Sequence, residues 1–429
     1  MLEASFVRNN PKLVRQAVKD KQLDVKVVDE WLAADKKKRA CQQEIDSLRA
    51  AMRENAQAVK KSLGKGKKKP DAELVAKGKK LKDDYKKLED DYKELMAEFE
   101  RLSLALPNVP AADVPVGSDE SGNQVVRQVG DKPKFDFQPR GHGELMKDLA
   151  WLDTKRAVEI GGFRSYMLQN EAVLLEQALL NYALKMLVNE GFTPMTAPSL
   201  VKPESMWGTG YFPWGEQDHY YTQDEQILAG TAEVALTAYR QGETLREKDL
   251  PVMMAGISPC FRREVGTYGK DTQGVIRVHQ FTKVEQVVYT VADEEETRKW
   301  HEKMVGLAEK LLQDLGVPYQ VLLMCTGDMG AGQRKKYDIE SWFPAQDKYR
   351  ETHSASYFND FQARRLKIKY KTRDNQLKYV YTLNNTMAAS PRLLACIVEN
   401  CQQADGSVRI PEVLQEAVGL KVVKPRIKK

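Results

Sequence analysis

Apolar residues recur along the first quarter of the chain at a spacing that is typical of paired helices. Within residues 27–63 they stand mostly three or four positions apart, at Cys41, Ile45, Leu48, Met52, Val59 and Leu63. Within residues 74–106 the repeat is cleaner, with Leu74, Leu81, Tyr85, Leu88, Tyr92, Leu95, Phe99, Leu102 and Leu106. A seam held over so many turns predicts two helices that pack along each other as a coiled coil.

The residues between the two segments predict a reversal of the chain. The glycines at 64 and 66 break the first helix, Pro70 cannot continue it, and Asp71 is suited to cap the second. Gly78 weakens the start of that second helix. We therefore expect an antiparallel hairpin, preceded by a short helix within residues 1–25. At ~1.5 Å per residue, such helices extend on the order of 50 Å.

The tip of this hairpin is basic. Six lysines and no acidic residue stand between positions 60 and 69, namely Lys60, Lys61, Lys65, Lys67, Lys68 and Lys69. Such a tip can neutralise nucleic-acid phosphates without reading base sequence. A solvated charge run that keeps a long hairpin soluble has the same composition. The segment alone leaves both interpretations open.

The remainder of the chain changes character after residue 106. Prolines and glycines mark a linker over 107–134. From Phe135 onward, helical and strand-like runs alternate irregularly, which predicts an α+β domain built on an antiparallel sheet. The expected organisation is a helical arm at 1–106, the linker, and a second domain at 135–429.

Composition narrows the class of protein. The chain has 429 residues and a modest net charge of +6. Its five cysteines, Cys41, Cys260, Cys325, Cys396 and Cys401, form no CxxC pair and lack zinc-ligand spacing. They are typical of free thiols in a reducing compartment. No apolar run reaches the ~18 residues of a membrane helix, and the first residues resemble no signal peptide. We expect a soluble cytoplasmic protein without zinc and without a membrane partner.

A candidate nucleotide site follows a strand-like run at 253–258. The run leads to Phe261, Arg262, Arg263 and Glu264, and a second apolar run returns through Val278, His279, Gln280 and Phe281. Two strands with a polar loop between them predict an antiparallel hairpin. A guanidinium at Arg262 can hold a phosphate, and the ring of Phe281 offers a purine a stacking surface. The alternative is a surface hairpin whose arginines are solvated.

The order of these residues is specific. The sequence FRRE at 261–264, a loop reading GKDTQG at 269–274 and the tail HQFTKVE at 279–285 resemble the second signature motif of class II aminoacyl-tRNA synthetases, in the form typical of the seryl-tRNA synthetase family. The resemblance implies that ATP is bound by Arg262, Arg263, Glu264, Val278, His279, Gln280 and Phe281.

Further motifs of that family concern the amino acid. Thr231, Ala232 and Glu233 resemble its TxE motif, which implies contacts to the ammonium group of L-serine. The alternative is a cap, with Thr231 starting a helix over 234–239, and the two interpretations are compatible. Glu285 resembles the second acidic residue of the amino-acid pocket. Its alternative is an exposed strand residue on the side of Lys283.

The next motif runs from Arg350 and precedes FQARR at 361–365. The resemblance implies that Glu351, Thr352, His353 and Ser354 bind ATP, with Glu351 and Ser354 also holding Mg²⁺ through oxygen ligands. His353 departs from the Ser usual in the family, and we assign it no metal role.

The last motif joins a strand to an apolar helix. Thr382 to Thr386, followed by Pro391 and Arg392, resemble the third class II motif. This implies that Asn384 and Thr386 contact serine and that Arg392 faces the γ-phosphate from a helix N-terminus. The departures at Asn385 and Met387 put the fine geometry of the pocket in question.

The resemblance covers nearly the whole chain, including the finish at 408–414 and a weak first motif at 174–198. It implies a homodimeric enzyme that uses ATP, L-serine and tRNA(Ser), with Arg262 and Arg392 as catalytic residues, Arg262 also contacting L-serine, and the arm gripping the tRNA. Charging of tRNA(Sec) stays open.

Three other classes of protein share parts of this pattern. An inactive RNA-binding paralogue should lack Arg262, Glu351 or Arg392, and all three are present. An amino-acid:carrier-protein ligase should lack the basic arm, but the arm is present here. A zinc-dependent seryl form should carry a Cys/Glu/Cys cluster, and no such cluster interrupts the pocket segment.

Overall fold

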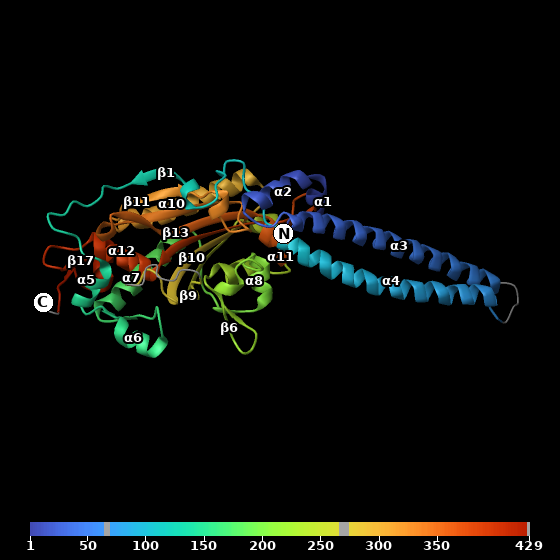
Figure 1. Cartoon of the computed structure of the whole chain (residues 1–429), viewed down its shortest axis with the longest axis horizontal. Coiled ribbons are helices and arrows are strands. Elements are labelled where there is room, and N and C mark those ends of the chain that lie inside the picture. Colours follow the sequence, from blue (N-terminus) through green and yellow to red (C-terminus); the bar gives the residue numbers. More distant parts are fainter. Residues whose placement is uncertain (64–68, 266–273, 427–429) are drawn as a thin grey trace. The chain divides into compact units, whose positions relative to one another are not determined.

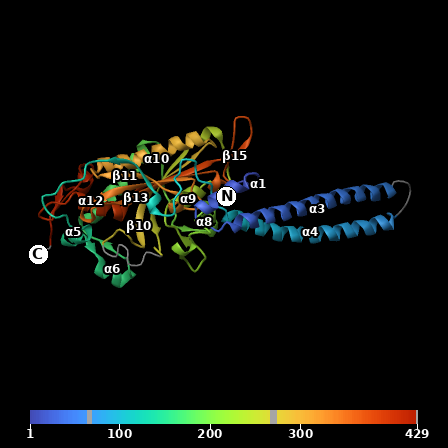
Figure 2. The ribbon, with the colours of Figure 1, turned by 45° about the horizontal axis from the view of Figure 1, so that its top comes forward.

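Two long helices, α3 (Lys26–Leu63) and α4 (Ala72–Ala105), run side by side as an antiparallel pair (Figures 1 and 2). The computed structural model describes residues 1–63, 69–265 and 274–426. The chain divides into two compact units: residues 2–19 with 23–107, and residue 1 with 20–22 and 108–429. The arm predicted from the apolar seam is confirmed. The glycines at 64 and 66 lie outside the described residues.

The two helices of the hairpin are held together by aromatic and polar contacts in addition to the apolar seam. The Trp31 and Phe99 rings lie 5.2 Å apart, and Trp31 Nε1 donates to Ser103 Oγ at 2.8 Å. Asp71 caps α4 by accepting the Glu73 N–H. Asn55 Nδ2 donates to the Leu74 carbonyl, and a Cβ on Gly78 would come within 2.9 Å of that nitrogen. The glycine therefore leaves room for a buried polar contact between the helices.

The first 25 residues differ from the prediction of a single helix. They form α1 (Ala4–Asn9) and α2 (Pro11–Asp20). Asn10 separates them because its backbone leaves the helical region and its side chain donates to the Phe6 carbonyl. The proline that follows fits the first turn of α2, where no N–H is needed.

An eight-stranded sheet forms the centre of the larger unit, in the order β1-β11-β12-β13-β16-β10-β9-β4. Its strands are β1 (Gln124–Val129), β4 (Thr193–Thr196), β9 (Val252–Phe261), β10 (Gln280–Thr290), β11 (Tyr319–Leu323), β12 (Lys335–Phe343), β13 (Lys348–Asn359) and β16 (Tyr381–Ala389). All neighbours are antiparallel except β4 and β9. The predicted α+β class, with a helical arm and an antiparallel sheet, is confirmed.

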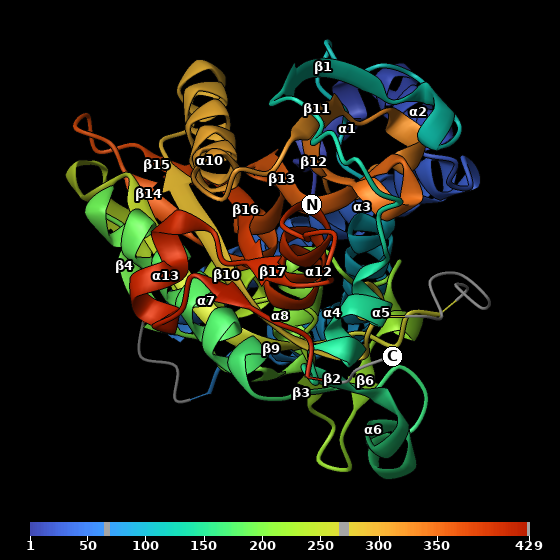
Figure 3. The same ribbon diagram turned by 90° about the vertical axis from the view of Figure 1, so that its left-hand side faces the viewer.

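Helices cover both faces of this sheet (Figure 3). The helices of the larger unit are α5 (His142–Asp148), α6 (Thr154–Gly161), α7 (Glu171–Asn189), α8 (Pro203–Thr209), α9 (Glu233–Ala238), α10 (Glu294–Asp314), α11 (Phe361–Leu366), α12 (Ser390–Asn400) and α13 (Glu412–Val418). The main apolar core lies between the sheet and α7, α10 and α12. A smaller cluster packs α9 and α11 on the opposite face. Because strand side chains alternate, each strand can supply one face to the core and the other to a site.

Short strands complete the unit: β2 (Leu152–Asp153), β3 (Met167–Leu168), β5 (Leu200–Val201), β6 (Tyr220–Tyr221), β7 (Ile227–Leu228), β8 (Thr244–Arg246), β14 (Lys369–Lys371), β15 (Leu377–Tyr379), β17 (Val408–Arg409) and β18 (Val422–Val423). Within the part of the chain that the structure describes, no helix has the length and apolar character needed to cross a membrane.

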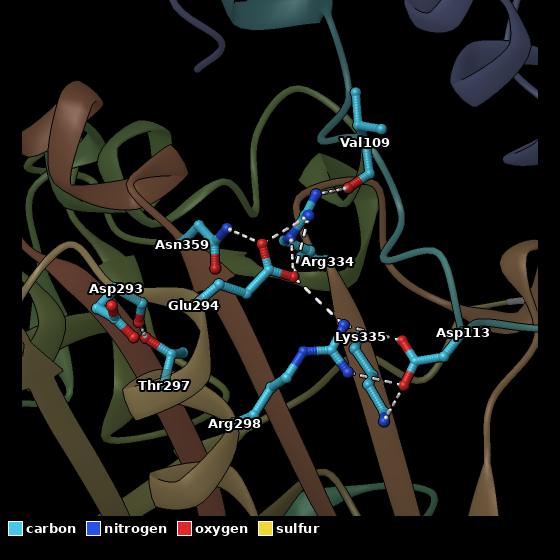
Figure 4. Close-up of polar contacts among 9 residues, drawn as sticks. All are labelled: Val109, Asp113, Asp293, Glu294, Thr297, Arg298, Arg334, Lys335 and Asn359. Atoms are coloured by element: carbon cyan, nitrogen blue, oxygen red, sulfur yellow. Dashed lines mark hydrogen bonds and ion pairs between the residues drawn. The ribbon is translucent and has the colours of Figure 1, made fainter.

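The segment predicted as a linker carries more structure than its composition suggested. It contains β1, which is largely exposed at the sheet edge and pairs with β11. Before β1 the segment is fixed by charged contacts (Figure 4): Arg334 pairs with Glu294 at 2.8 Å and donates to the Val109 carbonyl, while Asp113 pairs with Arg298 and Lys335. Val109, Ala111 and Val114 of this segment are also buried, and the last two belong to the main core, so ion pairs and apolar burial hold the segment together.

Candidate active site

Four adjacent strands, β13, β16, β10 and β9, bring the motifs of the second half of the chain together. The predicted hairpin is present as β9 and β10, in which Cys260 pairs with Phe281. Next to it, Glu285 on β10 pairs with Thr386 on β16. The antiparallel register thus places residues that are a hundred positions apart side by side on one face of the sheet.

A cavity opens on this face. Its lining consists of Tyr211, Glu233, Arg262, Glu264, Ile276, Val278, Phe281, Lys283, Glu285, Gln333, Glu351, Thr352, Ser354, Asn384, Thr386, Ala389, Pro391 and Arg392. Most residues named from the sequence are therefore gathered in one place. Those outside the lining are Thr231, Ala232, Arg263, His279, Gln280 and His353.

One end of the cavity carries two guanidinium groups, those of Arg262 and Arg392, which both act on the Glu351 carboxylate. The Arg262 guanidinium carbon lies 5.4 Å from the centre of the Phe281 ring, so that a cation and an aromatic face are adjacent, as the sequence predicted. Arg392 projects from the first turn of α12, where Pro391 stands at the start of the helix. Its Nη1 donates to Glu351 Oε2 at 3.1 Å and to the Glu351 carbonyl at 2.9 Å. This end can bind an anion with two guanidinium groups.

Glu351 and Ser354 both line the cavity, although an offset of three residues on a regular strand would turn them to opposite faces. A bulge explains their placement: His353 pairs with Ile339 and Glu351 with Glu340, which leaves Thr352 without an opposite residue. Burial opposes ionisation of Glu351, but Arg392, Lys336 and Arg262 outweigh it and lower its pKa to about 2. The carboxylate stays ionised near neutral pH.

These two side chains supply oxygen donors, which suit a hard cation such as Mg²⁺ when phosphate and water complete the shell. Among the described residues, no group of three or more His, Cys, Asp or Glu side chains is placed to hold a metal ion. The donor set is therefore too small for an all-protein cage and fits a cation that arrives with a phosphate ligand.

The other end of the cavity carries carboxylates. Glu233 is only 7% exposed, and its two oxygens accept from the Tyr211 hydroxyl at 2.8 Å and from Gln362 Nε2 at 3.0 Å. Burial, and next the charge of Glu285, raise the pKa of Glu233 to about 7. An incoming ammonium group would relieve both effects. This end therefore suits a cationic group.

The Thr231 hydroxyl bonds the start of a helix, as the alternative capping interpretation predicted, but the helix starts at a different residue. The helix α9 begins at Glu233, one residue earlier than expected, and Thr231 Oγ1 accepts the Glu233 N–H at 3.1 Å. Thr231 thus fixes the backbone that carries Glu233, while the Glu233 carboxylate faces the cavity. The alternative for Glu285 is wrong: this residue is 2% exposed. Thr386 Oγ1 donates to its Oε2 at 3.4 Å.

The departures from the family pattern lie on the face opposite the cavity. Asn385 Nδ2 donates to the Met304 carbonyl of α10, and Met387 belongs to the main core. The His353 ring nitrogens lie 2.9 Å from Thr352 Oγ1 and 3.2 Å from the Met387 carbonyl. Burial lowers the pKa of His353 to about 4, which keeps the ring neutral. Alternation along the strands removes these side chains from the lining.

Sequence reasoning missed three polar lining residues, Tyr211, Lys283 and Gln333, and two apolar ones, Ile276 and Ala389. Tyr211 and Gln333 stand in loops without a motif, and only the fold brings them to the cavity. Lys283 carried a signal, because strand alternation already placed it beside Glu285.

The basic tip lies in the other unit. Lys60 and Lys61 lie in the last turn of α3, and both are exposed, as is Lys69. Lys65, Lys67 and Lys68 lie outside the described residues. Exposed lysines fit both a phosphate contact and a solvated tip, so both interpretations stay open on geometry.

Comparisons with known proteins agree with the motifs. Residues 1–110 match the profile described as the seryl-tRNA synthetase N-terminal domain, and residues 216–401 match the tRNA synthetase class II core domain (G, H, P, S and T). The serine--tRNA ligase of Deinococcus radiodurans is 44% identical, over 98% of each chain. A crystal structure of seryl-tRNA synthetase from Pyrococcus horikoshii, complexed with ATP, superimposes with a TM-score of 0.94, at 39% identity and full coverage of both chains. A crystal structure of a cytoplasmic serine-tRNA ligase from Naegleria fowleri, in complex with AMP, superimposes with a TM-score of 0.87, at 30% identity over 99% of this chain and 97% of the other.

Proposed function

Because the chain belongs to the seryl-tRNA synthetase family, a class II group of ATP-dependent serine--tRNA ligases, we propose that its cavity forms seryl-adenylate from L-serine and ATP and passes serine to the 3′ end of tRNA(Ser). One observation carries the proposal. A single cavity is lined by the guanidinium groups of Arg262 and Arg392 and the ring of Phe281, and also by the buried carboxylates of Glu233 and Glu285. It can hold a nucleotide triphosphate and an amino acid in contact.

The chemistry needs no protein nucleophile. An oxygen of the serine carboxylate bonds to the α-phosphorus, the bond from that phosphorus to the bridging oxygen breaks, and pyrophosphate leaves. Catalysis then consists of positioning and of stabilising charge on the phosphates. We assign that stabilisation to Arg262 and Arg392. Phe281 stacks on the adenine ring.

Other ATP contacts follow from the lining and the motif together. Glu264, Val278 and Thr352 line the cavity, which supports a role in holding the nucleotide. Arg263, His279, Gln280 and His353 are proposed on the family motif alone. When Mg²⁺ is bound it neutralises phosphate charge, and Glu351 and Ser354 are the residues that would hold it.

The acidic end is assigned to the amino acid. We place the serine ammonium group against Glu233, with Thr231 and Ala232 fixing the backbone, and the serine hydroxyl against Glu285, Thr386 and Asn384. Burial supports this placement, since hydrogen bonds in a water-excluded site discriminate strongly.

A direct test is aminoacylation. The purified protein should attach labelled serine to tRNA(Ser) in the presence of ATP and Mg²⁺, and alanine or threonine should be attached far less. Loss of the attached label after mild alkali would show the expected ester. A protein that binds tRNA(Ser) but charges it with no amino acid would refute the proposal.

Two copies of the chain are proposed to associate through α7 and the neighbouring β4, the segment that resembles the first class II motif. Apolar side chains exposed on this helix, Val173, Leu174 and Val188, support a partner surface there. Sedimentation velocity should give twice the mass of one chain, and a single-chain mass at micromolar concentration would contradict the assignment.

We also propose a cytoplasmic location. All five cysteines are free thiols, four of them buried, which suits a reducing compartment. Cell fractionation followed by immunoblotting should find the protein with the soluble cytoplasmic fraction, and recovery from an oxidising compartment would count against it.

Replacing Thr386 by valine keeps the size of the side chain and removes its hydroxyl. Under the proposed assignment, kcat/KM for serine should fall by roughly tenfold or more, and that for alanine should change little, because only serine loses a partner. Serine- and alanine-dependent ATP–pyrophosphate exchange measures both. Thr290→Val is a matched control, since Thr290 is buried in the same sheet and bonds Thr297 outside the cavity. An unchanged serine-to-alanine ratio in Thr386→Val would remove this residue from the pocket.

A further inference from the structure

Lys283 is a buried lysine on β10 that lines the candidate active site. Its residue is 4% exposed, and its neighbour on the same strand face, Glu285, is 2% exposed. A lysine at such depth is rare unless it is paired, because burying an ammonium group without a partner is costly. The proposed chemistry has so far given this side chain no role.

The contacts of Lys283 converge on one point of the cavity. Lys283 Nζ lies 2.6 Å from Glu285 Oε2 and 3.5 Å from Thr386 Oγ1. Pairing with β9 is regular here, with Lys283 opposite Ser258 and Glu285 opposite Gly256. Because successive side chains alternate, the lysine and the glutamate point to the same side, into the cavity.

The charges at this end suit an amino-acid substrate. When both carboxylates, Glu233 and Glu285, are ionised, Lys283 cancels one of them and leaves one negative charge for the incoming ammonium group. The other titratable neighbours that face this end are the phenol of Tyr211 and the thiol of Cys260, both neutral in ordinary conditions because burial raises the pKa of each. Arg262 is the next cation; it lines the same cavity and lies close enough to Tyr211 and Cys260 to interact with them electrostatically.

A hydroxyl group donates one hydrogen bond and accepts others, whereas a carboxylate only accepts and an ammonium only donates. The Lys283–Glu285 pair therefore offers a substrate hydroxyl a partner for each of its roles. Glu285 accepts its hydrogen, and Lys283 donates to its oxygen. A methyl group in the same place would leave both charged groups without that partner.

We propose that Lys283 is a specificity-determining residue, which donates to the side-chain hydroxyl of serine while Glu285 accepts from it. The inference rests on the proposed seryl activity and deepens it. It differs from a purely structural role, in which Lys283 would only neutralise Glu285 and every amino acid would depend on it equally.

The test is Lys283→Met, which keeps the length of the side chain and removes its charge and donors. In ATP–pyrophosphate exchange, kcat/KM for serine should fall about 10- to 100-fold, the range for a hydrogen bond to a charged group. The alanine value should change far less, and KM for ATP should stay the same. Equal losses for serine and alanine, or no loss for serine, would overturn the proposal.

Lys283→Met leaves Glu285 buried beside no cation, which can destabilise the protein. The double variant Lys283→Met/Glu285→Gln removes both charges together and should fold. Its serine-to-alanine ratio should fall at least as far as in the single variant, and a preserved ratio would overturn the proposal even if the single variant is insoluble.

Lys299→Met is the matched control, because Lys299 forms an exposed pair with Glu295 on α10. Its exchange kinetics should equal those of the parent protein. Measurements on the unmodified protein distinguish a failure of the proposed function from a failure of the role of Lys283. Exchange that does not depend on serine in the parent would refute the proposed function, whereas serine-dependent exchange with an unchanged ratio in both Lys283 variants would refute only the role of the lysine.

Discussion

Replacing Arg262 or Arg392 by alanine is expected to slow serine-dependent ATP–pyrophosphate exchange by about 10²–10³, the usual cost of losing one preorganised stabilising donor. Each guanidinium faces the cavity end that we assign to the phosphates, and each is held in place before substrate arrives. Arg262 lies against the Phe281 ring, and Arg392 is fixed by Glu351 and by the Ile276 carbonyl.

Lysine at position 262 should recover little of the lost rate, because an ammonium group cannot form two parallel hydrogen bonds with a phosphate. Arg409→Ala is a suitable control, since Arg409 is an exposed arginine on β17. Circular dichroism and thermal unfolding would establish that each variant is folded. Exchange rates near those of the parent in a folded Arg262→Ala or Arg392→Ala protein would show that these groups do not act on the phosphates.

Shortening the arm is expected to abolish charging of tRNA(Ser) while sparing exchange, if the basic tip grips tRNA phosphates. Removing the whole hairpin between about residues 27 and 104 would also remove Trp31, Phe99 and Leu102 from the apolar base of the arm. That loss would expose Val7, Val14 and Val18, which pack in the same cluster. A deletion of 47–86, closed by a short glycine–serine turn, keeps that base and the contact of Cys41 with the Leu88 carbonyl. Aminoacylation and exchange should then separate by orders of magnitude.

Point substitutions refine this test. Serine at the described tip positions, Lys60, Lys61 and Lys69, should raise KM for tRNA and reduce its salt dependence, because fewer counterions are released on binding. Serine at Lys299, Lys303 and Lys310 of α10 is the matched control, since these exposed lysines pair with nearby carboxylates. Equal loss of exchange and charging in a folded, shortened protein would contradict this division of labour.

The sequence predicted what depends on local pattern. The apolar seam located the long helices, Asp71 marked the start of α4, and the order of motifs identified the hairpin of β9 and β10. Strand alternation also explains why Asn385 and Met387, departures from the family pattern, do not reach the cavity. Their neighbours Asn384 and Thr386 occupy the face that does.

What the sequence could not predict depends on irregular backbone and distant contacts. A bulge at Thr352 turns Glu351 and Ser354 to one face, and no pattern of residues in the sequence predicts this bulge. Tyr211 reaches Glu233 from a loop after α8. The burial of Glu285 follows from α9 packing over its strand, so the exposed alternative was reasonable for an isolated strand and wrong for this fold.

The central claim is that one cavity holds ATP and serine together so that the carboxylate can attack the α-phosphate. Serine-dependent ATP–pyrophosphate exchange by the purified protein, without tRNA and with Mg²⁺ present, tests it most directly. We predict exchange that requires L-serine, saturates with it, and falls far below the serine rate with alanine, glycine or threonine. Exchange that is absent, independent of added amino acid, or faster with another amino acid than with serine would contradict the claim.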